Sequence, residues 1–381
     1  MCRRSPCSRK GCAMNDAPVQ GSDLRAAREA AGVGLREFAR RTHWSAAYIS
    51  QVERGLRPVN ADMAKAYADA LGTDPVPPPG DPVRIAHEWL LADPPPVEHM
   101  ASGRRVGSSL ADEMERRVVE LRRLDDVVGG TTLHPVVRCD LDAARAVVRD
   151  ASHTPETRRR LLRVVGELSQ LGGWVYADAG QYQRAQGVYL DGVTAATEAG
   201  DRPLAGQLFS TLSYMVANVG DPHDAGLMAR TALRGASADA PPVVRALLGE
   251  RVAWAAAKAK DSDAARRALD QVDDEYDRRR PGDTEPDWTY WLNRDEIDVM
   301  RARCAVELGD AATAETLLSP VVERYPAERR REAALYRSWL AEAYARAGEF
   351  DAARAALAKV PADTGSERVE RRVADVTRLL V

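Results

Sequence analysis

One pattern recurs through most of this 381-residue chain and limits what the chain can fold into. A helical stretch ends, a turn follows, and an alanine stands at a fixed place in the next helical stretch. The recurring alanines, separated by 40, 40, 49 and 39 residues, are Ala185, Ala225, Ala265, Ala314 and Ala353. A small residue at a fixed place lets two helices approach closely, and helical hairpins of this kind bury a continuous core only by stacking. The pattern therefore predicts an all-α chain with an α-solenoid of stacked helical hairpins over residues 108–381.

The amino-acid composition also favours helices. Alanine and arginine are abundant, whereas isoleucine, phenylalanine and lysine are scarce, and this balance suits helices better than sheets. The gap of 49 residues holds a polar insertion, YDRRRPGDTEPDWTYW, which we interpret as an extended loop. Residues 109–128 and 136–150 are interpreted as a further, degenerate pair of helices.

A second, separate group of helical patterns covers residues 22–72. Ser22 can cap the first helix, which ends at Gly32. The stretches LREFARR, SAAYISQVER and ADMAKAYADALG predict three more short helices, and Gly72 closes the last of them. This region is therefore expected to form a small domain of its own.

The segments that flank this domain have no repeating pattern. Residues 1–21 are basic and predict a disordered tail, or a natural start of translation at Met14. Residues 73–107 hold eight of the chain's 22 prolines, which predicts a stiff connector with one short helix around residues 85–91.

The helix that begins at Ser45 has two unlike faces. Ile49 and Val52 point to one side and are predicted to be buried. Only three residues separate this helix from the preceding one, so the two cross steeply and the outer face of the second is prominent. That face fits the major groove of DNA because it carries only small and hydrogen-bonding residues and one arginine. Its residues are Ala47, Ser50, Gln51 and Arg54.

The whole stretch LRAAREAAGVGLREFARRTHWSAAYISQVERGLRPVNADMAKAYADALG resembles the xenobiotic-response-element helix-turn-helix family, relatives of the phage repressors. The resemblance implies that Ala46, Ala47 and Gln51 face bases, whereas Arg54 and its neighbours contact phosphates. Since two alanines offer no hydrogen bonds, we expect base recognition to depend on Gln51, Tyr48 and Ser50. The full set of expected DNA-binding residues is Arg36, Ala46, Ala47, Tyr48, Ser50, Gln51, Arg54 and Arg57.

The repeats at the other end resemble tetratricopeptide repeats, with a period longer than the roughly 34 residues of that family. In the last unit the matching residues are Leu340, Tyr344, Gly348, Phe350 and Ala353. In the first unit they are Tyr176, Gly180, Tyr182, Ala185 and Tyr189. The resemblance covers the region from about residue 108 onward.

One position of the 40-residue register is aromatic in three successive repeats. The resemblance places this position on the first helix of each pair, on the side that lines a concave groove. Aromatic rings flanked by polar side chains on a concave wall suit a peptide or a flat organic ligand. The alternative is that the rings are ordinary packing between helices. The expected groove residues are Gln170, Trp174, Asp178, Tyr214, Asn218, Glu250, Trp254 and Lys258.

The combined features favour a sequence-specific DNA-binding transcriptional regulator whose repeat domain senses a peptide or small ligand, or mediates dimerisation. The alternative is a protein–protein adaptor that uses the repeat domain, with the helix-turn-helix as a docking module. The expected partners are double-stranded DNA, a second copy of the chain in a homodimer, and a peptide, small molecule or protein on the repeat domain.

Other classes of function have little support in the sequence. No phosphate-binding loop, nucleophile elbow or metal-spaced His/Glu pair is present, so we expect no enzyme and no cofactor. Cys2, Cys7 and Cys12 match no zinc spacing, so we expect no metal. No apolar run reaches the roughly 20 residues of a membrane helix, and no secretory signal pattern is present, which predicts a cytoplasmic protein.

Overall fold

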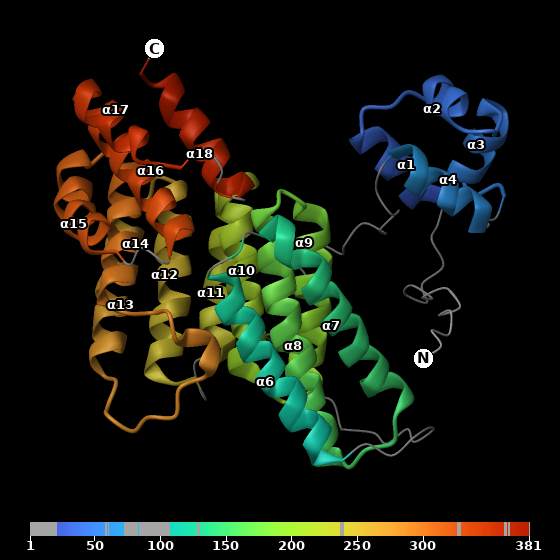
Figure 1. Ribbon diagram of the computed structural model, residues 1–381, viewed down its shortest axis with the longest axis horizontal. Coiled ribbons are helices and arrows are strands. Elements are labelled where there is room, and N and C mark those ends of the chain that lie inside the picture. Colours follow the sequence, from blue (N-terminus) through green and yellow to red (C-terminus); the bar gives the residue numbers. More distant parts are fainter. Residues whose placement is uncertain are drawn as a thin grey trace, which may run out of the picture. The chain divides into compact units, whose positions relative to one another are not determined.

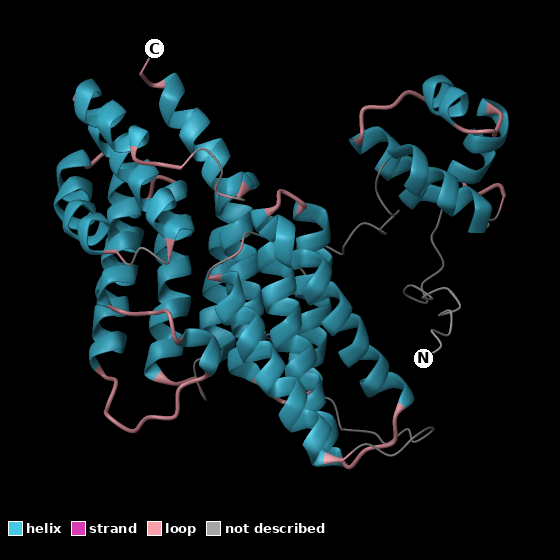
Figure 2. Cartoon of the chain, viewed as in Figure 1, coloured by secondary structure: helices cyan, strands magenta, loops and turns pink. Residues whose placement is uncertain are grey.

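The computed structural model describes residues 21–71, 83 and 107–380, apart from residues 58, 60, 127, 129, 237–239, 326–328, 362–363 and 365. Every regular element within these ranges is a helix, which confirms the predicted all-α fold (Figure 2). The predictions for the amino-terminal tail, its cysteines and most of the proline-rich connector lie outside the described residues. By its contacts the chain divides into two compact units, residues 1–79 and 80–381.

The amino-terminal unit is built from four short helices, with bounds close to those predicted from the sequence. They are α1 (Gly21–Ala30), α2 (Leu35–Arg41), α3 (Ala46–Glu53) and α4 (Ala61–Leu71). Their core contains Phe38, Ile49 and Val52, as expected, together with Tyr67, whose ring centroid lies 4.2 Å from that of Phe38. Gly32 and Gly55 have a positive φ, 66° and 71°, and end α1 and α3 in the left-handed conformation that glycine adopts without strain.

The second unit consists of helical hairpins that follow one another along the chain (Figure 1). The leading helices are α6 (Ser108–Asp125) and α7 (Gly130–Asp150). The first helices of the pairs are α8 (Pro155–Asp178), α10 (Arg202–Val219), α12 (Pro242–Lys258), α14 (Arg294–Leu308) and α16 (Arg330–Ala347). The second helices are α9 (Tyr182–Glu198), α11 (Pro222–Ala236), α13 (Ser262–Asp277), α15 (Ala311–Arg324) and α17 (Phe350–Ala358). The last helix is α18 (Glu367–Arg378).

The sequence register explains how these hairpins stack. All five recurring alanines are completely buried, one in each second helix. First helices contact first helices, because α8 packs on α10, α10 on α12, α12 on α14 and α14 on α16. The predicted solenoid is therefore present in the described residues.

The aromatic register position forms a continuous row of rings. The ring centroids of Trp174 and Tyr214 lie 6.1 Å apart, and those of Tyr214 and Trp254 lie 6.3 Å apart. Trp339 on α16 continues the row at 5.5 Å from Trp254, edge to face. Trp174, Tyr214 and Trp254 follow the helix stack because each stands at the same place in its own first helix, whereas Trp339 lies three residues before that place in α16.

The insertion after α13 differs from the extended polar loop predicted for it. Residues Asp287–Thr289 form a short 3-10 helix, η1, in which Trp288 is buried in the core together with Leu292. The hydroxyl of Tyr290 donates to the carboxylate of Asp126, at 2.7 Å, and so ties the insertion to the end of α6. The first half of the insertion is polar and suggested a loop, but the second half is aromatic. Burying these aromatic side chains favours a folded segment over an extended loop.

Among the described helices, none is long and apolar enough to span a bilayer.

Candidate DNA-binding helix and ligand cavities

The outer face of α3 carries the residues expected to contact DNA. The hydroxyl of Ser45 caps the helix by accepting the backbone N–H of Tyr48, at 3.2 Å. Ile49 and Val52 point into the core, which leaves the opposite face to solvent. On that face Ala47 and Arg54 are exposed, whereas Ser50 and Gln51 are half-buried. Among the other expected residues Arg36 and Arg57 are exposed, and Ala46 and Tyr48 are half-buried.

Gln51 is held in place by a neighbour that follows the helix. The guanidinium Nε of Arg57 donates to Oε1 of Gln51, at 2.7 Å. The same guanidinium lies 5.0 Å from the ring centre of Tyr48, which stacks on Trp44 at 4.9 Å. The side-chain amide of Gln51 is thus oriented before any partner arrives, with one of its hydrogen bonds already made. This arrangement can present a hydrogen-bonding edge to a base.

A buried carboxylate anchors α3 to the rest of the unit. Glu53 accepts hydrogen bonds from Nε and Nη2 of Arg28, at 2.6 and 2.8 Å, and from the hydroxyl of Tyr67, at 2.6 Å. Arg28 also donates to the carbonyl oxygen of Val33, at 2.9 Å. These contacts join α1, α3 and α4. Glu53 lies within the stretch that resembles the helix-turn-helix family, and the structure gives it a physical role.

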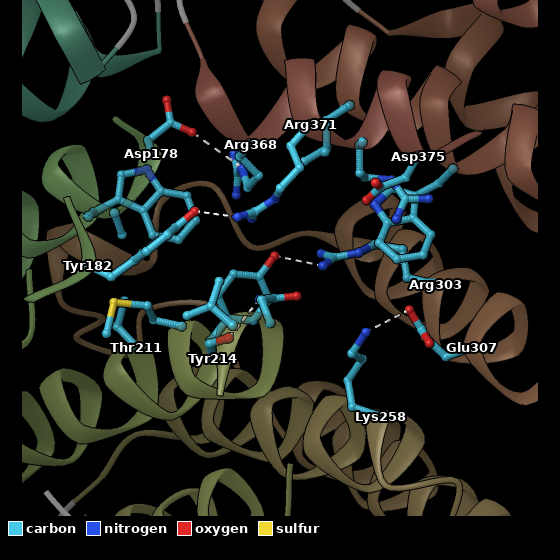
Figure 3. Close-up of a pocket in the computed structure, with 18 of the residues that line it drawn as sticks. Asp178, Tyr182, Thr211, Tyr214, Lys258, Arg303, Glu307, Arg368, Arg371 and Asp375 are labelled. Atoms are coloured by element: carbon cyan, nitrogen blue, oxygen red, sulfur yellow. Dashed lines mark hydrogen bonds and ion pairs between the residues drawn. The ribbon is translucent and has the colours of Figure 1, made fainter. Parts of the chain in front are cut away.

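Two adjoining cavities lie among the first helices of the repeat unit. The smaller cavity encloses about 810 Å³ and the larger about 1060 Å³ of empty space, part of it open to solvent. The residues that line both cavities are Trp174, Thr211, Tyr214, Arg303, Leu335 and Arg368. Figure 3 shows the smaller cavity.

Seven of the eight expected groove residues line one or both of these cavities. They are Gln170, Trp174, Asp178, Tyr214, Asn218, Glu250 and Lys258. Trp254 is the exception, because its side chain is completely buried and lines neither cavity. The groove position expected for Trp254 is therefore wrong, and its ring has the alternative role of packing between helices.

Several of the polar residues expected in the groove already have partners within the protein. Asp178 accepts from the hydroxyl of Ser366, at 2.7 Å, and forms an ion pair with Arg368. The amide of Asn218 donates to the carbonyl of Tyr214 in its own helix, at 2.6 Å. Lys258 forms an ion pair with Glu307 at 3.1 Å (Figure 3). These groups shape the walls, and their charges are largely satisfied without a ligand.

The last helix, α18, supplies basic side chains that the groove prediction omitted. Arg368 and Arg371 line the smaller cavity, where Arg368 also lies 4.8 Å from the ring centre of Trp174 and Arg371 donates to the hydroxyl of Tyr182. Arg372 pairs with Glu342 on α16. One helix thus connects the first hairpin to the last. Spacings of three and four residues put these arginines on one side of a helix, which the sequence could have revealed.

Arg303 is the second omission, and the repeat register could have found it. The step of 49 residues that carries Ala265 to Ala314 also carries Trp254 to Arg303. Arg303 therefore continues the aromatic row as a cation. Its guanidinium Nη2 donates to the hydroxyl of Tyr214, at 2.6 Å. The Cζ atom of the same guanidinium lies 4.5 Å from the ring centre of Trp254.

The charges around Tyr214 shift the ionisation of nearby groups. Burial by itself raises the pKa of the Tyr214 phenol, but Arg303, Arg368 and Arg251 outweigh burial and lower it to about 7. Burial also raises the pKa of the Glu250 carboxyl, to about 8.

Comparison with known proteins identifies both ends of the chain. A helix-turn-helix domain model matches residues 21–77, and a tetratricopeptide repeat model matches residues 305–374. Two proteins described as uncharacterized HTH-type transcriptional regulators, from two strains of Mycobacterium tuberculosis, are each 49% identical over 51 residues. The similarity covers 13% of this chain, and the chain spans 36% of the length of these curated relatives. This chain accordingly has a helix-turn-helix domain at its amino-terminal end and tetratricopeptide repeats in its carboxy-terminal part.

Proposed function

We propose that this protein is a sequence-specific DNA-binding transcriptional regulator whose repeat domain senses a small ligand in the cavities around Tyr214. The observation that carries the proposal is the outer face of α3, with small residues, an exposed Arg54 and a pre-oriented Gln51. A helix of this kind fits the major groove of B-DNA. The helix-turn-helix match and the names of the mycobacterial relatives support the same function.

The sensing half of the proposal is supported by the residues that line the two cavities. They combine aromatic walls with many charged side chains, so they suit a small ligand that has both an apolar body and charged or polar groups. Regulators of this architecture commonly bind two half-sites as two-fold dimers, so we propose a homodimer on DNA. Cytoplasmic localisation follows from the proposed function.

The first test identifies the bound DNA and then compares two variants. Genome-wide mapping of DNA bound by the full chain supplies a specific site, and a shuffled sequence of equal length supplies the control. Gln51→Ala removes a side chain that can read a base edge, so specific affinity should fall by about 1–3 kcal/mol while affinity for shuffled DNA stays the same. Arg57→Ala should reduce discrimination in the same direction, because it releases Gln51 from its fixed orientation.

Arg54→Ala serves as the contrasting variant. A phosphate contact is insensitive to sequence, so this substitution should weaken binding to both DNAs and reduce its dependence on salt. Equal losses on specific and shuffled DNA for Gln51→Ala would contradict the role of Gln51 in base recognition. The absence of any preferred genomic site would favour the adaptor alternative.

A further inference from the structure

Five arginines are buried in the part of the chain that the structure describes, and two of them lack a proper counter-charge. Arg28, Arg122 and Arg331 each have a carboxylate oxygen close by, at 2.6 Å from Glu53, 2.7 Å from Glu167 and 3.2 Å from Asp125. The other two are Arg251 and Arg303, both 6% exposed. Buried charges in proteins are normally paired and hydrogen-bonded, so this pair requires an explanation.

The partners of Arg251 and Arg303 neutralise them only in part. The one carboxylate near Arg251 is that of its chain neighbour Glu250, at 3.8 Å, and burial raises the pKa of this carboxyl to about 8, which leaves it mostly protonated at neutral pH. Arg303 has no ion pair with any described carboxylate, and its hydrogen bond goes to the hydroxyl of Tyr214, whose phenol has a pKa of about 7 and is therefore only partly ionised at neutral pH. The Nε atoms of both arginines are buried without a hydrogen-bond partner in the described parts of the chain.

The two guanidinium groups face one place. They lie 4.7 Å and 5.4 Å from the ring centre of Tyr214, and both line the larger cavity. The remaining walls of that cavity include apolar surfaces, among them Trp174, Trp291, Met300 and Leu335. Carboxylates also line it, but Asp125 is paired with Arg331, and Asp126 and Glu296 accept hydrogen bonds from tyrosine hydroxyls. Guanidinium groups present donors in a planar fork that matches the oxygens of a carboxylate or a phosphate.

We propose that the larger cavity binds a small organic oxyanion, with its carboxylate or phosphate group between Arg251 and Arg303 and a flat apolar body against Trp174 and Trp291. The proposal rests on the ligand-sensing part of the proposed function and specifies the chemistry of the ligand. The oxyanion supplies the counter-charge that the two arginines lack, and the aromatic walls exclude water from the ion pair, which strengthens it. Tyr214 then lies beside the anion, and its protonated hydroxyl can donate a hydrogen bond to it. The row of aromatic rings that contains Tyr214 restricts the body of the ligand to a flat shape.

The test measures direct binding to the full chain by calorimetry, without DNA. Three probes share one flat body: naphthoate carries a carboxylate, naphthyl phosphate carries a phosphate, and naphthamide is neutral. We expect at least one anion to bind about tenfold more tightly than naphthamide, since each hydrogen bond to a charged group strengthens the complex. The anion that binds more tightly indicates whether the natural ligand carries a carboxylate or a phosphate.

Variants locate the bound anion. Arg303→Gln and Arg251→Gln should each weaken the anion about tenfold or more and leave the weak binding of naphthamide unchanged. Arg301→Gln is the matched control on the same helix, because Arg301 pairs with Asp273 and lines neither cavity, and it should keep the full affinity. Two arginine variants are used because, if one of them fails to fold, the other still tests where the anion binds.

Three results would overturn the inference. The first is equal affinity for naphthamide and both anions, and the second is no anion binding at about 1 mM. The third is full affinity in both arginine variants. Each is independent of DNA recognition, so a failure here leaves the DNA-binding proposal intact, and a failure to bind DNA leaves this measurement valid.

Discussion

The carboxylate of Glu53 joins three of the four helices in the amino-terminal unit, through Arg28 on α1 and Tyr67 on α4. Glu53→Gln keeps the shape of the side chain but leaves the buried Arg28 with only the exposed Glu29 carboxylate, at 3.7 Å, as a counter-charge, so we expect a loss of about 3 kcal/mol of folding free energy for this unit. Hydrogen exchange checks this, with faster exchange in peptides from α3 and unchanged exchange in peptides from α8 of the same chain. The control is Glu37→Gln on the exposed Arg41–Glu37 pair, which should leave exchange unchanged. Slow exchange of α3 in the Glu53 variant would show that the network is dispensable.

Glu250 gives the second unit a dependence on pH. Burial raises the pKa of its carboxyl from 4.5 to about 8, and the charged groups that act on it are Arg251 on its own helix and Glu296 and Arg303 on α14. The unfolded chain loses this proton first as pH rises. The stabilising contribution is therefore complete below pH 4.5 and is lost as pH rises through about 8. Glu250→Gln mimics the protonated form, so it should stabilise the chain by about 4–5 kcal/mol near pH 9 and by about 1 kcal/mol near pH 5.

Denaturant melts of this variant at the two pH values measure the effect. Glu113→Gln on the exposed surface of α6 is the control, and it should show no such difference. If the substitution changes the free energy of unfolding by the same amount at both pH values, the Glu250 carboxyl of the natural chain is already ionised near pH 5.

Helices α8 and α9 approach closely at a glycine. A Cβ atom at Gly173 would lie 2.3 Å from the ring of Tyr189, which is completely buried. Gly173→Ala should therefore destabilise the repeat unit by about 1–3 kcal/mol, because the ring has no room to move in the core. Gly187→Ala, in the interior of α9, meets no atom within 4 Å and should instead stabilise by about 0.5–1 kcal/mol, since alanine favours the helix. Thermal melts of the two variants should thus shift in opposite directions, and a stabilising Gly173→Ala would show that the packing at Tyr189 adapts.

The whole chain contains two compact units, residues 1–79 and 80–381. Because each unit has its own hydrophobic core, we expect two calorimetric transitions, with enthalpies that increase with the size of the unit. Glu53→Gln should move one transition, and Gly173→Ala the other. A single transition shifted by both substitutions would instead indicate that the two units unfold together.

Local patterns in the sequence were sufficient to predict most of the α-helices and the register in which the hairpins stack. Capping residues and turns placed the helices of the helix-turn-helix, and Ile49 and Val52 were assigned to its core correctly. The alanines identified the hairpin pairs, because a small residue is needed wherever two neighbouring helices meet. These features depend on residues within one turn or one hairpin of each other, so a single sequence displays them. The 40-residue register by itself also places Trp174 and Tyr214 on one line.

Only the tertiary structure decided which of the aromatic residues in this register border a cavity and which residues of later hairpins face them. Trp254 has the same register position as Trp174, yet it is buried, because Arg303 and Trp339 from later hairpins pack over it. Arg303 meets Tyr214 across 89 residues of sequence, and Ser366 meets Asp178 across 188. The periodicity of a helix carries no information about such partners, since they are set by how the hairpins stack and where the chain returns. For the same reason the cavity, its unpaired arginines and the cover formed by α18 arise only once the solenoid is assembled.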